Sequence, residues 1–104
     1  MIVRSWRGRA SPAKPDAYPT HFAHNVLRAL RGTDGFLGAT LLRETQGDVI
    51  EFLVLTRWTS LEAIRAFAGA DVGNAVVEPE GVAALVSFDP RVRHYEVVQD
   101  TSVG

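Results

Sequence analysis

Polar and apolar residues alternate at the start of the chain with a period of two, which is typical of a strand. In residues 1–7, Ile2, Arg4 and Trp6 fall on one face. Further strands are predicted by three later segments rich in β-branched and aromatic residues: 36–45, 49–58 and 92–99. Because only the short turn 46–48 separates the two middle segments, they predict an antiparallel hairpin.

Helical spacing of apolar residues occurs twice between these strands. Asp16 is placed to cap a helix that runs to about Arg31. A second helix follows a cap at Thr59 or Ser60 and ends at Gly69. The apolar stripes of the two helices are Phe22, Val26, Ala29 and Leu30 in the first, and Leu61, Ile64, Phe67 and Ala68 in the second.

The segment 70–90 is predicted to be irregular, because Pro79 and Pro90 interrupt it, with a short turn or strand over 83–88. The order is then β-α-β-β-α-β, the split β-α-β arrangement. We therefore expect one α+β domain over 1–104 of the ferredoxin-like class, a four-stranded antiparallel sheet with two helices on one face.

Both faces of the predicted hairpin strands are apolar. Phe52 and Val54 alternate with Leu53 and Leu55. Two helices cover only one face, so a monomer would leave the other in water, where large apolar patches are uncommon. We expect a homodimer that packs sheet against sheet.

Composition narrows the classes of function. Hydrophobic residues make up 46% of the 104 residues, charged residues 22%, and the net charge is −1. A nucleic-acid partner is not expected at that charge, and no apolar run is long enough to span a membrane. The absence of cysteine excludes disulfides and thiolate chemistry. It fits a cytoplasmic location, as does an amino terminus too short and too charged to be a signal peptide.

Polar residues of the first predicted helix share one face at helical spacing: His21, His24, Asn25 and Arg28. The set is either a solvated helix face or a polar patch beside a cleft. We do not expect a metal site, since no carboxylate completes a ligand set.

Histidine and arginine side chains also lie on the predicted strands. His94 shares a face with Val92 and Glu96. We expect a structural imidazole paired with Glu96, which would raise the pKa of His94, rather than a catalytic base. Charged strand residues are expected in buried or interfacial ion pairs: Arg4, Arg43, Arg57 and Glu51. Trp58 ends its strand either as the wall of a pocket or as a core residue.

Taken in order, several segments resemble the antibiotic biosynthesis monooxygenase-like family over nearly the whole chain. They are Ile2 to Gly8, Glu51 to Trp58, Ser60 to Gly69, Val76 to Glu80 and His94 to Val97. The resemblance implies a dimeric α+β barrel. It also implies a tryptophan at the end of the third strand that lines the cleft, which Trp58 matches. Val54 stands where the tailoring oxygenases of the family carry an asparagine. The second helix lacks the histidine that ligates iron in the haem-degrading members.

The resemblance implies a cofactor-independent monooxygenase-like protein that acts on a small, flat, mostly apolar, polyketide- or quinol-like molecule. His24 or His21 is the expected base, and no cofactor or metal is expected. The side chains expected to contact the ligand are Trp58, Trp6, Asn25, Arg43 and Phe67. The alternatives are a non-catalytic ligand-binding or stress-response dimer on the same scaffold, and haem binding through one of the histidines.

Overall fold

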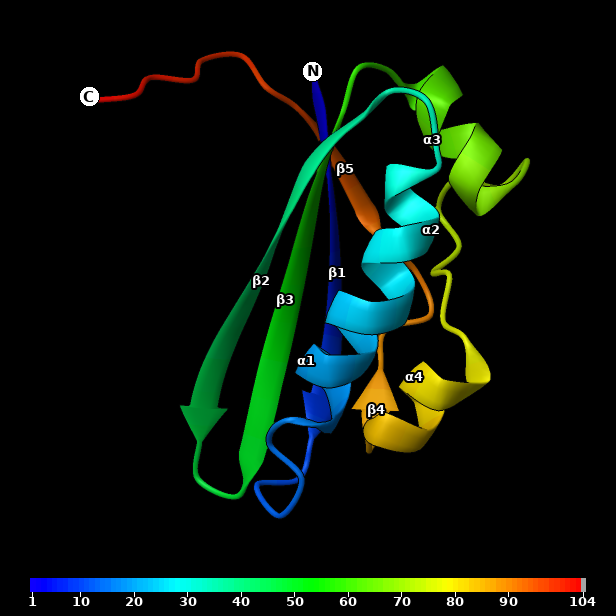
Figure 1. The fold of residues 1–104 in the computed structure, drawn as a ribbon. Coiled ribbons are helices and arrows are strands. Elements are labelled where there is room, and N and C mark those ends of the chain that lie inside the picture. Colours follow the sequence, from blue (N-terminus) through cyan, green and yellow to red (C-terminus); the bar gives the residue numbers. More distant parts are fainter. Residues whose placement is uncertain (104) are drawn as a thin grey trace.

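The computed structural model describes residues 1–103 and contains one antiparallel sheet with helices on one of its faces (Figure 1). Its strands are β1 Ile2–Ala10, β2 Phe36–Gln46, β3 Val49–Trp58, β4 Ser87–Phe88 and β5 Arg93–Glu96. The path runs β2-β3-β1-β4, and β5 also pairs with β1. The ferredoxin-like α+β prediction is confirmed.

The outer edge of β1 is covered by two short strands in succession. Ser87 and Phe88 of β4 pair with Arg9 and Gly8, and β5 pairs with the segment 2–5. The final strand predicted over 92–99 is therefore shorter than expected, and β4 fills the rest of the edge. Trp6 lies between the two paired segments on β1.

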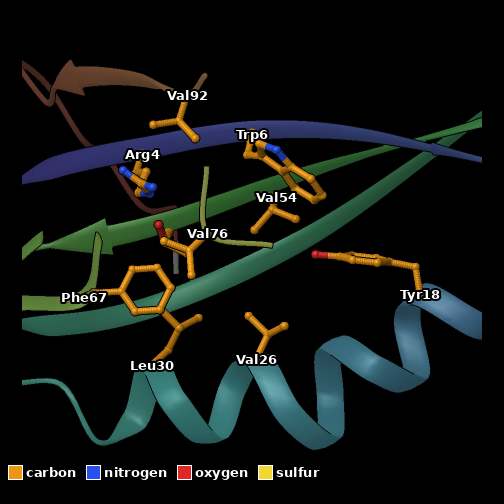
Figure 2. Close-up of a pocket in the computed structure, with 10 residues that line it drawn as sticks. Arg4, Trp6, Tyr18, Val26, Leu30, Val54, Phe67, Val76 and Val92 are labelled. Atoms are coloured by element: carbon orange, nitrogen blue, oxygen red, sulfur yellow. The ribbon is translucent and has the colours of Figure 1, made fainter. Parts of the chain in front are cut away.

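The first helical segment is continuous but changes type along its length. It consists of α1 Ala17–His21, the π-helical turn η1 Phe22–Val26 and α2 Leu27–Arg31. Tyr18, Phe22 and Leu30 are buried in it, and Val26 is half-buried. The i, i+4 ladder from Tyr18 to Leu30 thus faces the sheet: Phe22 packs in a core cluster with Phe52 of β3, and Figure 2 shows Tyr18, Val26 and Leu30 directed towards the strands.

The other helices are α3 Leu61–Ala68 and α4 Pro79–Ala84. Of the two predicted caps for α3, Ser60 is the one used, since its hydroxyl accepts from the Ala63 N–H at 3.2 Å. The prediction that the segment 70–90 is irregular was wrong for residues 79–84, which form α4. Pro79 starts this helix rather than breaking it, because a proline in the first turn gives up no helical hydrogen bond.

The two faces of the sheet differ in burial, as β3 shows most clearly. Every second residue from Ile50 to Trp58 is buried under the helices, and the residues between them, from Glu51 to Arg57, are partly exposed. The helices lie on one side only (Figure 1). Among the described residues, no helix is long and apolar enough to cross a membrane.

Candidate functional site

A small chamber lies between the helix-side face of the sheet and the first helical segment, with a volume of about 40 Å³ (Figure 2). Ten residues line it: Arg4, Trp6, Tyr18, Val26, Leu30, Val54, Thr56, Phe67, Val76 and Val92. They come from both inner strands, the first helical segment, α3 and the segments before α4 and β5. Most are apolar, so the few polar groups determine what the chamber can recognise.

An outer groove of about 310 Å³ adjoins the chamber. Val26, Phe67 and Val76 line both spaces, so the groove continues from the chamber between the first helical segment and α3. Val76 is 45% exposed and lies at the junction. Glu78 lines the groove and contributes the carboxylate found there.

The aromatic wall of the chamber is built from Trp6 and Tyr18. Their ring centroids are 5.7 Å apart, and the Trp6 indole N–H donates to the carbonyl oxygen of Asp89 at 2.8 Å. Figure 2 shows the Tyr18 hydroxyl directed into the chamber. Burial, with the charge of Glu78, raises the pKa of Tyr18 well above its ordinary value. The phenol is therefore protonated and can donate a hydrogen bond.

Arg4 is the cationic group of the chamber and is 5% exposed. Its Nη1 donates to the carbonyl oxygen of Val72 at 2.5 Å and its Nη2 to that of Asn74 at 2.7 Å. Burial lowers the pKa of Arg4 to about 10, so the guanidinium is charged at neutral pH. The predicted ion pair of Arg4 is not found, since no carboxylate of residues 1–103 lies within 4.0 Å of it.

His94 lies directly opposite Arg4 in the β1–β5 pairing. Its Nε2 is 3.0 Å from Arg4 Nη1, and since a guanidinium only donates, Nε2 accepts. Burial and the Arg4 charge lower the pKa of His94. The expected pairing with Glu96 and a raised pKa were wrong, because the nearest charge to the imidazole is a cation.

Two of the residues predicted to contact a ligand, Trp6 and Phe67, line the chamber. Trp58 lies in the core instead. It is fully buried with Leu30 and Ile64, its indole N–H donates to the Thr56 hydroxyl at 2.8 Å, and its ring lies 5.7 Å from that of Phe67. Of the two interpretations left open for Trp58, this geometry favours the core residue.

The predicted helix-face residues lie at another place. His21, His24 and Asn25 line an open depression beside α4 that shares no residue with the chamber. The Asn25 amide is 3.0 Å from His21 Nδ1 and donates to Glu80 at 2.9 Å. A base at His21 or His24 would therefore act on a molecule in this depression. Arg43, also predicted, is exposed and lies 3.8 Å from Asp16.

Sequence reasoning did not include Arg4 and Tyr18 in the site. Arg4 shares one strand face with the apolar residues Ile2 and Trp6. This position could have indicated a buried charge, which is costly unless a partner or a function requires it. Tyr18 extends the apolar ladder of the first helix back by one turn. No group of three or more histidine, aspartate or glutamate side chains in residues 1–103 is arranged to hold a metal ion.

A ferredoxin-like α+β domain with an apolar chamber under its helices is the class that this fold and geometry define. Residues 1–78 match the model of the antibiotic biosynthesis monooxygenase family, and the chain belongs to that family. No curated protein matches the chain.

Solved structures with the same fold include a haem degrader and two oxygenases. MhuD from Mycobacterium tuberculosis, with two haems bound in its active site, is 27% identical with a TM-score of 0.66, covering 98% of this chain and 100% of its own. The cofactor-independent oxygenase SnoaB from Streptomyces nogalater is 21% identical (TM-score 0.63, 95% of each chain). The ActVA-Orf6 monooxygenase of Streptomyces coelicolor, in complex with nanaomycin D, is 20% identical (TM-score 0.60, 98% and 89%).

Proposed function

We propose that the protein is a cofactor-independent monooxygenase-like enzyme whose substrate is a small, flat, mostly apolar molecule of polyketide or quinol type. The observation that supports this most directly is the apolar chamber, with polar groups from Arg4, Tyr18 and Thr56, in the fold of this family. SnoaB and the nanaomycin D complex of ActVA-Orf6 are oxygenases on the same fold.

Oxygenation without a metal or flavin requires the substrate to supply the electrons, usually as a stabilised carbanion or enolate. The protein then has to hold that anion and exclude water. Trp6 and Phe67 supply apolar walls, and the Tyr18 hydroxyl can donate to a carbonyl oxygen of the ligand. The chamber admits only a small part of such a molecule, so the outer groove takes the rest.

The matched pair Val76→Phe and Val86→Phe tests this location. Val76 lies at the junction of chamber and groove, whereas Val86 is 66% exposed and lines neither. Wild-type protein and Val86→Phe should bind a flat naphthoquinol and consume oxygen with it. Val76→Phe should weaken binding at least about tenfold, because the larger side chain fills the junction. Tryptophan fluorescence in a Trp58→Phe background reports binding through Trp6, and an oxygen electrode reports turnover.

The two variants also separate the alternatives. Binding without oxygen consumption in every variant would favour a non-catalytic ligand-binding protein over an enzyme. Equal binding by the two valine variants would place the ligand elsewhere.

Haem binding is a second candidate, favoured by the 27% identity to MhuD. The α3 helix has no histidine, so a histidine elsewhere would have to ligate the iron. A Soret band that sharpens on titration with haemin, and that is lost in one histidine variant, would support this candidate. An unchanged haemin spectrum would exclude it.

We also propose that the chain forms a homodimer through the sheet face that the helices leave uncovered. That face carries Leu42, Leu53 and Leu55, of which Leu42 is 44% exposed. Helices lie on the other side of the sheet alone (Figure 1).

A further inference from the structure

No carboxylate of residues 1–103 lies within 4.0 Å of the Arg4 guanidinium, so its positive charge is not paired there. Its three acceptors are two backbone carbonyls and the unprotonated Nε2 of His94, all of them neutral. A buried charge without an opposite charge is costly to maintain. The arrangement holds the guanidinium in one orientation but does not neutralise it.

Arg4 also has guanidinium N–H donors that these three contacts do not engage. A guanidinium has five N–H groups, and the contacts with Val72, Asn74 and His94 engage two on Nη1 and one on Nη2. The Nε–H and the second Nη2 hydrogen have no acceptor among the described residues. Two guanidinium donors can bind two oxygens of one anion, the geometry in which arginine holds carboxylates most strongly.

The surroundings of Arg4 restrict what can reach those donors. The chamber, at about 40 Å³, has room for about three or four water-sized atoms, since one water needs roughly 10–15 Å³. That suits the oxygens of a head group and not a ring system. A ligand body in the outer groove would lie beside the carboxylate of Glu78. The charge pattern thus favours an apolar body outside and an anionic head inside.

We propose that the chamber is a head-group site for an organic anion, in which the Nε–H and Nη2–H of Arg4 bind a carboxylate or enolate oxygen. The flat apolar body of the same molecule extends past Phe67 and Val76 into the outer groove. His94 is a positioning residue that holds the guanidinium in place by accepting a hydrogen bond from Nη1. This inference rests on the proposed function, because it names the class of ligand that the same site takes.

Two pairs of probes with the same shape and different charge test the inference on wild-type protein. 2-Naphthoate is compared with neutral 2-naphthamide, and 2-hydroxy-1,4-naphthoquinone, which is an enolate at neutral pH, with its neutral methyl ether. Binding is measured by calorimetry. The anion of at least one pair should bind about tenfold more tightly or better, since a hydrogen bond to a charged group outweighs a neutral one. The pair with the larger preference distinguishes a carboxylate from an enolate ligand.

Arg4→Met should abolish this preference, and Arg65→Met should keep it. Arg65 is an exposed arginine on α3 that pairs with Glu62 and serves as the matched control. If Arg4→Met does not fold, proton–nitrogen NMR of wild-type protein replaces it. One protected guanidinium Nε–H signal should then shift with naphthoate and stay in place with naphthamide.

Equal affinity for the charged and neutral members of both pairs would overturn the inference and leave the proposed apolar site intact. A preference for anions that persists in folded Arg4→Met would also overturn it. If neither member of either pair bound, the proposed function and the inference would fail together.

Discussion

Arg4 and His94 face each other across β1 and β5, and their contact predicts that acid destabilises the protein at His94. His94 accepts from Arg4 through Nε2, and a protonated ring would lose that bond and place a second positive charge beside the first. The folded state therefore favours the neutral imidazole, with the pKa of His94 below its ordinary value of 6.5.

We predict that the free energy of unfolding falls as the pH drops below about 6.5. The unfolded chain binds a proton at His94 before the folded chain does, so stability is lost from the unfolded pKa down to the folded one. Glutamine can accept from Arg4 without titrating, so His94→Gln should remove this part of the pH dependence. Urea unfolding at several pH values measures it.

The exposed His24 provides the control for this prediction. His24→Gln also removes one histidine and should keep the acid dependence of the wild type. An identical pH profile for His94→Gln and wild type would show that the Arg4–His94 contact is not the source.

Trp58 is a second residue whose role the geometry defines. It is fully buried among Leu30, Ile64 and Phe67, so Trp58→Ala leaves a large cavity. We predict a loss of about 3–5 kcal/mol in the free energy of unfolding, measured in urea. Leu61→Ala on the exposed side of α3 should change it by less than about 1 kcal/mol. A small loss for Trp58→Ala, together with weaker ligand binding, would restore the pocket-wall interpretation.

At the scale of single residues, the sequence predicted which face of a strand or helix a side chain occupies, because the period of the element determines that face. Trp6 and Phe67 were placed on faces that turn out to line the chamber. The roles of Arg4 and His94 were not predictable, because their mutual contact and those of Arg4 with Val72 and Asn74 join residues 68 to 90 positions apart. The period of a strand predicts the face on which a side chain lies, but it does not predict which residue far along the chain contacts that side chain.

At the scale of elements, local signals determined how well each boundary was predicted. The β2–β3 hairpin and the capped α3 followed from turn and cap residues within each segment. The α4 helix did not, because it has only six residues and Pro79 can either start or break a helix. One strand was predicted along the outer edge of β1, where the structure has β4 and β5. A strand of two residues such as β4 has too few positions to show a period.

At the scale of the whole molecule, the uncovered sheet face is the surface through which we propose that the chain dimerises. We predict that light scattering at micromolar concentration gives about twice the chain mass of 11.3 kDa. Leu53→Glu should shift the protein towards monomer, because Leu53 lies between Leu42 and Arg7 in the register of that face. Val82→Glu, which alters an exposed side chain of α4, should leave the mass unchanged. A wild-type mass of one chain would contradict the dimer.

The π-helical turn from Phe22 to Val26 affects which side of the first helix its buried residues occupy. Four residues exceed one α-helical turn by about 40°, so a long i, i+4 ladder in a regular helix drifts around its axis. The wider turn takes back part of that drift, and Tyr18 and Leu30 stay on one side. Deleting one residue of this turn would rotate Tyr18 by about 100° around the helix axis relative to Leu30. The Tyr18 hydroxyl would then leave the chamber, which would change the polar groups that a ligand meets without altering a residue of the sheet.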